Sequence, residues 1–137
     1  MSIDLRRGRT CLFLLHVHLV FVTKYRRGVF TKAALEDLRG IFQSVCHDFR
    51  GSLVEFEGEQ DHVHLLVHYP PKVSVSRLVN SLKGVSSRMV QLKGYESIHK
   101  HLWGNALWSP SYFAGACGGA PLAVIRQYIE QQKTPEE

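Results

Sequence analysis

The chain has 137 residues, of which 45% are hydrophobic and 21% charged. This is enough for one domain with its own core and too little for two, and the composition is that of an ordinary folded protein. No segment approaches the roughly 18 uncharged apolar residues of a membrane span, because two histidines interrupt the densest apolar run, residues 11–22. The formal net charge of +5 favours an anionic partner, which for a small basic protein is most often nucleic acid.

The three cysteines, Cys11, Cys46 and Cys117, are odd in number and widely separated, and they form no Cys-x-x-Cys pair. This pattern argues against a disulfide framework and against a thiolate zinc site. We therefore expect reduced, buried thiols. No small-residue cleavage site of a signal peptide follows the first apolar stretch, so we expect a cytoplasmic protein without a membrane segment.

The first half of the chain predicts a strand, a helix and two further strands. Residues 12–23 are rich in Val, Leu and Phe, which favours a strand. Apolar residues at three- and four-residue spacing predict a helix over 32–49, which Thr31 can cap. Alternation over 52–57 predicts a strand, and a turn at 58–61 leads into the next one, so these two strands are expected to pair as an antiparallel hairpin.

The second half predicts a helix, a strand and a last helix. Ser74 or Ser76 can cap the first of these helices. Weak periodicity over 94–105 indicates a loop or a fraying helix. Residues 108–117 favour a strand, and a helix is expected from Pro121 to about Gln132.

The order strand, helix, strand, strand, helix, strand predicts an α+β fold of the ferredoxin-like (RRM-like) kind. In it an antiparallel sheet carries helices on one face. The last helix is an addition to that arrangement. With no repeat or low-complexity linker in the sequence, residues 1–137 are expected to form a single domain.

The segment 61–67, Asp-His-Val-His-Leu-Leu-Val, carries the strongest chemical signal. Successive side chains of a strand point to opposite faces, so His62 and His64 project together, and two parallel imidazoles can clamp a metal ion. His16 and His18 form a second such pair. Taken alone, either pair is more often a set of ordinary strand residues, so the residues by themselves do not choose between them.

The last predicted helix presents Tyr128 and Gln132 four residues apart and therefore on one face. A phenol and an amide oxygen are thus offered together. Taken alone, Tyr128 would more often be a helix residue half buried against the sheet.

Five segments in this order resemble those of the single-tyrosine HUH transposases of the insertion-sequence 200/605 group. They are Lys24-Tyr25-Arg26-Arg27, Asp61-His62-Val63-His64-Leu65-Leu66, Lys83-Gly84-Val85-Ser86-Ser87-Arg88, Gly118-Gly119-Ala120-Pro121-Leu122 and Gln127-Tyr128-Ile129-Glu130-Gln131-Gln132. Each segment alone is unspecific, but together they span most of the chain.

The resemblance implies the chemistry of a metal-dependent DNA transposase. It assigns His62, His64 and Gln132 as ligands of a divalent ion, Mg²⁺ or Mn²⁺, and Tyr128 as the nucleophile, and it leaves the His16 and His18 pair out of the metal site. Such enzymes cleave single-stranded DNA at insertion-sequence ends, keep the 5′ side as a phosphotyrosine and rejoin it to another 3′-hydroxyl.

The resemblance also implies an organisation along the chain and a set of partners. A core of about 10–117 would be followed by a hinge at 118–120 and a tyrosine helix at 121–133. The expected partners are single-stranded DNA with hairpins at the element ends and a second copy of the chain, in a homodimer whose active sites are shared between subunits.

The basic segments are candidate DNA contacts, by charge and by resemblance. The candidates are Lys24, Tyr25, Arg26, Arg27, Lys83 and Arg88. Tyr25 and Trp108 are possible surfaces for base stacking, although a tryptophan in such a chain is more often a packing residue. The face with Lys83 and Arg88 is equally compatible with a solvated helix surface.

Two other functions are compatible with the same residues. One is a noncatalytic or domesticated protein that binds DNA hairpins without cutting them, but such a protein does not need the full set of two histidines, tyrosine and glutamine. The other is a replication-initiator or relaxase-like nickase, and those enzymes resemble longer chains.

Overall fold

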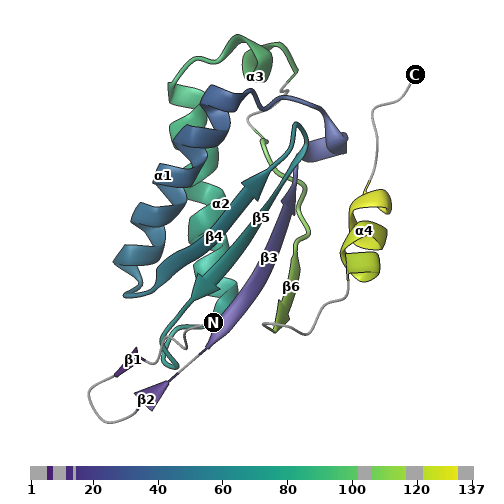
Figure 1. The fold of residues 1–137 in the computed structure, drawn as a ribbon. Coiled ribbons are helices and arrows are strands. Elements are labelled where there is room, and N and C mark those ends of the chain that lie inside the picture. The colour runs from purple at the N-terminus through teal and green to yellow at the C-terminus, as the bar shows by residue number, and fades with distance from the viewer. Residues whose placement is uncertain (1–5, 8–11, 14, 102–105, 117–121, 133–137) are drawn as a thin grey trace.

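The computed structural model describes residues 6–7, 12–13, 15–101, 106–116 and 122–132. Its main sheet is antiparallel, in the order β4-β5-β3-β6. The strands are β3 (His16–Val22), β4 (Ser52–Gly58), β5 (His62–His68) and β6 (Phe113–Ala116), and the long helices are α1 (Lys32–Asp48), α2 (Val75–Leu92) and α4 (Leu122–Glu130). Helices α1 and α2 cover one face of the sheet, and α4 packs on the other (Figure 1). The predicted ferredoxin-like α+β fold is confirmed.

The pairing of β3 with β5 determines which side chains share a face. Their register runs from His16 opposite His68 to Val22 opposite His62. The face toward α1 and α2 is fully apolar, and the opposite face carries the histidines. The side chains that these two central strands contribute to the main core are Val17, Leu19, Phe21, Val63, Leu65 and Val67.

Both long helices begin at a capping hydroxyl. The side-chain oxygen of Thr31 accepts a hydrogen bond from the Ala34 amide at 3.2 Å, and that of Ser74 accepts one from Arg77 at the same distance. Ser74, rather than Ser76, is therefore the cap of α2. Each cap satisfies an amide that has no carbonyl partner within its own helix.

The first predicted strand is divided in two. The pairing of β3 with β5 begins at His16, which lies opposite His68, the last residue of β5. Strand β2 (Leu12–Phe13) instead pairs with β1 (Arg6–Arg7) in a separate two-stranded sheet.

Strand β4 departs from strict alternation. The sequence pattern predicts Val54 on the same face as Phe56, but Val54 is 46% exposed while Phe56 is buried. The register with β5 shifts between Leu53 and Glu55, which marks a β-bulge. An extra residue in one strand reverses the alternation on one side of it, so Leu53 rather than Val54 packs against the core.

Two segments that follow α2 in the chain differ from the prediction. The segment predicted as a loop or a fraying helix contains α3 (Glu96–His101), which the fully buried Ile98 anchors in the core. The Tyr95 hydroxyl at its start donates a hydrogen bond to Asp37 of α1. Strand β6 begins only at Phe113, and Trp108 forms an isolated bridge with Thr23.

Some predictions fall partly or wholly on residues that are not described. Of the three cysteines, Cys46 is a free, buried thiol whose pKa burial raises to about 12, whereas Cys11 and Cys117 lie outside the described residues. The predicted hinge at 118–120 lies outside them as well. Among the helices of the described part, none has the length and apolar character needed to cross a bilayer.

The glycine that follows α1 generates a stability prediction. A Cβ at Gly51 would lie 2.3 Å from the carbonyl oxygen of His68, a backbone atom that cannot turn aside. We expect Gly51→Ala to lower the free energy of unfolding by about 1–3 kcal/mol in urea denaturation, the scale of an overpacked site. Gly40→Ala, inside α1 with open space around it, should instead raise it by about 0.5–1 kcal/mol. Equal effects of the two substitutions would contradict this prediction.

Candidate active site

Two histidines open strand β5 and share its face away from the main core. The rings of His62 and His64 have centroids 5.1 Å apart, while Val63 and Leu65 between and after them are fully buried on the other face. The alternation predicted from the sequence is therefore present. The role of these rings as metal ligands stays a prediction.

A carboxylate orients the first of these rings. Nδ1 of His62 lies 2.7 Å from Oδ1 of Asp61. An ionised carboxylate only accepts hydrogen bonds, so Nδ1 carries the proton and, in the neutral ring, Nε2 keeps a free lone pair. This is the arrangement by which proteins commonly orient a histidine that binds a metal.

The second ring is held neutral by its surroundings. Burial, with smaller contributions from the neighbouring His62 and His18, lowers the pKa of His64 to about 4 against an opposing effect of Glu57. At neutral pH the ring therefore offers a lone pair rather than a positive charge, as a metal ligand must.

The other histidine pair is divided between two neighbours. His16 stacks on His68 with ring centroids 4.7 Å apart, and the ring of His18 lies 5.6 Å from that of His64. Among the described residues, no group of three or more His, Cys, Asp or Glu side chains is arranged to hold a metal ion. A metal ion bound by His62 and His64 would therefore take any third ligand from another residue type or another chain.

The tyrosine helix packs on the same face of the sheet. Tyr128 and Ile129 of α4 lie against Val20 and Val22, which are the β3 partners of His64 and His62. The ring of Tyr128 also lies 6.0 Å from that of Phe113 on β6. The tyrosine is thus placed over the strand next to the histidines.

Two serines hold the polar groups of Tyr128 and of Gln132, which lies just past the end of α4 at Glu130, although the sequence predicts a helix that includes it. The hydroxyl of Ser111 lies 3.0 Å from that of Tyr128 and 3.2 Å from Oε1 of Gln132, and the Ser109 hydroxyl donates to the same Oε1 at 3.1 Å. Either hydroxyl can be the donor in the contact between Ser111 and Tyr128. Burial raises the pKa of Tyr128, and the contact with Ser111 partly offsets this.

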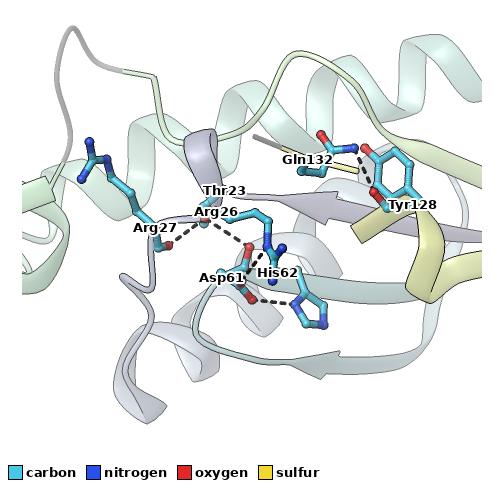
Figure 2. A network of polar contacts seen from close by, with 7 residues as sticks. All are labelled: Thr23, Arg26, Arg27, Asp61, His62, Tyr128 and Gln132. Atoms are coloured by element: carbon cyan, nitrogen blue, oxygen red, sulfur yellow. Dashed lines mark hydrogen bonds and ion pairs between the residues drawn. The ribbon is translucent and has the colours of Figure 1, made fainter. Parts of the chain in front are cut away.

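In this arrangement Tyr128 and Gln132 do not meet the histidines. An open cavity of about 670 Å³ is lined by Asp61, His62 and His64 at the end of the hairpin and by other side chains of α4, including Arg126 and Glu130. Figure 2 shows Tyr128 and Gln132 together, apart from Asp61 and His62. The predicted ligand role of Gln132 stays a prediction.

Sequence reasoning missed the two serines and two of the α4 residues that line the cavity, Arg126 and Glu130. Ser109 and Ser111 stand in a Ser-Pro-Ser segment before β6, which reads only as a turn. Arg126 and Glu130 are four residues apart, which places them on one helix face, but nothing in that spacing says which face meets the histidines.

Comparisons with known proteins identify the family. The family model described as "Transposase IS200 like" matches residues 11–132. The ISDra2 transposase TnpA of Deinococcus radiodurans is 30% identical over 136 residues, covering 99% of this chain and 96% of the relative. The transposase for insertion sequence element IS200 of Salmonella typhimurium is 32% identical over 115 residues, covering 84% of this chain and 74% of the relative.

The chain belongs to the IS200-like transposase family.

Solved structures agree with this assignment. A crystal structure described as a putative transposase from Deinococcus radiodurans superposes on this IS200-like transposase with a TM-score of 0.82 at 31% identity, covering 95% of this chain and 99% of the other. A REP-associated tyrosine transposase bound to a REP hairpin gives a TM-score of 0.57 at 14% identity, covering 91% of this chain and 68% of the other. At that identity the second likeness concerns the fold alone.

The predicted DNA-contact residues of the transposase lie in different surroundings. Tyr25 is 43% exposed, with the ammonium of Lys24 5.6 Å from the centre of its ring, so it is available for stacking. Trp108 is not, because it is only 7% exposed and its indole nitrogen donates to Ser86 at 2.9 Å. Arg88 is exposed on α2.

Lys83 of α2 supports the loop before β6. Its ammonium donates to the carbonyl oxygens of Ser109, Pro110 and Ser111 at 2.7, 3.3 and 3.2 Å. Burial lowers the pKa of this ammonium. All three of its protons are thus directed at the segment whose two serines hold Tyr128 and Gln132.

This arrangement predicts a structural cost for removing the ammonium. Lys83→Met keeps the length of the side chain but leaves three carbonyl groups without their donor, so we expect the free energy of unfolding to fall by about 1–3 kcal/mol. Arg88→Gln, on the exposed side of α2, should change it by less than about 0.5 kcal/mol. Urea denaturation of both variants checks this. Unchanged stability of Lys83→Met with weakened hairpin binding would instead make Lys83 a DNA contact.

Proposed function

We propose that this transposase cleaves and rejoins single-stranded DNA at insertion-sequence ends, in a metal-dependent reaction through a 5′-phosphotyrosine. One observation carries the proposal. The helix with Tyr128 packs on the sheet face that presents His62 and His64, over the direct strand partners of those two histidines. A nucleophile and a pair of imidazoles thus lie on one surface of the sheet.

The histidine pair fits a divalent ion. His62 has its proton fixed on Nδ1 by Asp61, and His64 is neutral, so each ring can give one lone pair. With the amide oxygen of Gln132 as a third, neutral ligand, we propose Mg²⁺ or Mn²⁺ as the occupant. The chemistry such an ion supplies is neutralisation of the charge on the scissile phosphate.

Tyr128 performs the covalent step in this proposal. Its hydroxyl oxygen attacks the phosphorus in line, the bond from phosphorus to O3′ breaks, and O3′ leaves with a proton as a free 3′-hydroxyl. The tyrosine proton is lost in the same step, and the phosphate stays on Tyr128 and on the 5′ side of the DNA. A 3′-hydroxyl from another end then attacks this phosphotyrosine, which rejoins the DNA and restores the phenol.

The covalent step requires the tyrosine helix to engage a histidine pair. In the present arrangement the Tyr128 hydroxyl is hydrogen-bonded to Ser111, and Oε1 of Gln132 accepts from two serines. Because the described residues of one chain bring only two donors together at the histidines, we propose that Gln132 and Tyr128 complete the site of a second subunit. The functional unit in this proposal is a homodimer with shared active sites.

We further propose that the substrate is recognised as single-stranded DNA with hairpins at the element ends. The fold is that of a transposase whose structure holds a REP hairpin. The net charge of +5 supports binding to a phosphate backbone. Exposed Tyr25 next to Lys24 offers a surface for an unpaired base, and Arg27 and Arg88 remain candidates for phosphate contacts.

Tyr128→Phe separates cleavage from binding. The variant keeps the ring that packs on Val20 and Val22 and loses only the nucleophilic oxygen. We expect the covalent protein–DNA adduct formed with labelled single-stranded element ends and Mn²⁺ to fall by at least about 10³-fold on a denaturing gel, while hairpin affinity is kept. Hairpin binding by the wild type without any adduct under either metal would support a noncatalytic hairpin-binding protein instead.

A mixing experiment tests the shared site. Tyr128→Phe lacks the nucleophile and His64→Ala lacks one imidazole, so each homodimer is expected to be inactive. A mixed dimer with sites built across subunits holds one site with both groups intact, and co-refolded protein should therefore recover part of the adduct. If recovery is absent although mixed dimers are present by mass spectrometry, the tyrosine acts within its own subunit.

A further inference from the structure

The turn between β3 and α1 is held in an unusual backbone conformation. Tyr25 and Arg26, in the 3-10 turn η1 (Lys24–Arg26), have φ values of 60° and 54°. Left-handed backbone costs roughly 1–2 kcal/mol for a residue other than glycine. Two such residues in succession persist only when their surroundings fix them, and such strain is concentrated at functional sites.

Backbone contacts fix both ends of this turn to the hairpin that carries the histidines. The amide of Thr23 donates to the carbonyl of Asp61 at 2.9 Å, and the amides of Val29 and Phe30 donate to the carbonyl of Gln60 at 2.9 and 3.0 Å. The hydroxyl of the buried Thr23 lies 2.7 Å from the carbonyl oxygen of Arg27 and 3.2 Å from that of Asp61. The turn between β3 and α1 and the hairpin turn just before β5 therefore form one unit.

Within this unit a chain of polar contacts leads from Arg26 to His62. Nε of Arg26 lies 3.5 Å from Oδ2 of Asp61, and the other oxygen of the same carboxylate lies 2.7 Å from Nδ1 of His62 (Figure 2). The three side chains are 28%, 22% and 15% exposed, so these contacts are partly shielded from water. Each carboxylate oxygen has one partner, which fixes the rotation of the group.

The next arginine is arranged differently. Arg27 enters this network only through its backbone carbonyl, and Figure 2 shows its side chain directed away from Asp61. Two adjacent arginines of equal charge thus differ in whether the guanidinium reaches the carboxylate next to His62.

We infer that Arg26 is a positioning residue for the metal site: through Asp61 it fixes the ring of His62 with the proton on Nδ1 and Nε2 available to the ion. The inference rests on the proposed function in that it takes His62 as a ligand. It gives the strained turn a purpose, because the left-handed backbone at Tyr25 and Arg26 places the Arg26 guanidinium against Asp61. The sequence pattern assigns Arg26 to DNA, whereas in the structure its guanidinium contacts Asp61, which in turn contacts His62.

A first test reads the histidine ring directly in the metal-free protein. Two-dimensional ¹H–¹⁵N spectra of the imidazoles distinguish the two neutral tautomers. We expect His62 to be the Nδ1-protonated form in the wild type and in Arg27→Gln, a mixture of both forms in Asp61→Asn, and an intermediate state in Arg26→Gln. A spectrum of Arg26→Gln identical to that of Arg27→Gln would overturn the inference.

A second test measures Mn²⁺ affinity by titration calorimetry without DNA. Removing a positive charge near a cation site would, by Coulomb's law alone, raise affinity for the cation in both arginine variants. We expect Arg26→Gln instead to lower it by about tenfold, the smaller end of the effects seen when a group behind a metal ligand is removed. Arg27→Gln should not lower it. The variant Arg26→Gln with Asp61→Asn should bind no more weakly than Asp61→Asn alone, since the arginine acts through the carboxylate.

The two experiments separate failure of this inference from failure of the proposed function. If the wild type shows no Mn²⁺ binding that depends on His62 and His64, the proposed metal site is wrong, and the tautomer comparison still decides whether Arg26 acts on His62. If the wild type binds Mn²⁺ and Arg26→Gln binds it equally well, only the positioning role is overturned. Hairpin affinity measured in EDTA completes the comparison, and a larger loss for Arg26→Gln than for Arg27→Gln, with Mn²⁺ affinity unchanged, would make Arg26 a DNA contact.

Discussion

Antiparallel pairing of β3 with β5, in the register that places Val22 opposite His62, sets the chemistry of both sheet faces. A slip of one residue would turn every side chain of a strand to the other face. The histidines would then point into the core, and Leu65 would point outward. The hydrophobic face that α1 and α2 cover therefore fixes the position of the histidines, although neither helix contributes a residue to the cavity beside them. Core packing and site geometry are two results of one hydrogen-bonded ladder.

The sequence predicts the elements that are long enough for their apolar residues to recur at a regular spacing on one face. The stripe of α1 and the alternation of β5 are both long enough to show which residues face the core. Helix α3 is too short for such a stripe, and its place in the core depends on Ile98, a single residue. The bulge in β4 has no signature in the residue types, so the sequence pattern predicts the wrong face for Val54.

The candidate site likewise has parts that the sequence predicts and parts that it does not. Local geometry puts His62 and His64 on one face, and helical spacing brings Gln132 to the backbone of Tyr128, where its Nε2 donates to the carbonyl at 3.1 Å. Contacts across loops could not be predicted, because the path of a loop is set by packing far along the chain. Lys83 is the clearest case, since a lysine on a helix gives no sign that its ammonium will cross to three carbonyls of residues 109–111. Arg26 is another case. Its contact with Asp61 is made from a turn with left-handed backbone, which a run of basic residues does not predict.

The bulge in β4 also affects how readily this chain aggregates with other copies through the edge of its sheet. Strand β4 is an edge of the sheet, and an edge strand offers unpaired amides and carbonyls to any other extended chain. The irregularity at Val54 interrupts that row of groups, and the carboxylates of Glu55 and Glu57, both exposed, repel a second copy of the same strand. At the opposite edge, β6 reads Phe-Ala-Gly-Ala and carries no charge. The two edges of the sheet thus differ in their protection against aggregation, because β6 has neither a bulge nor a charge and is protected by its short length.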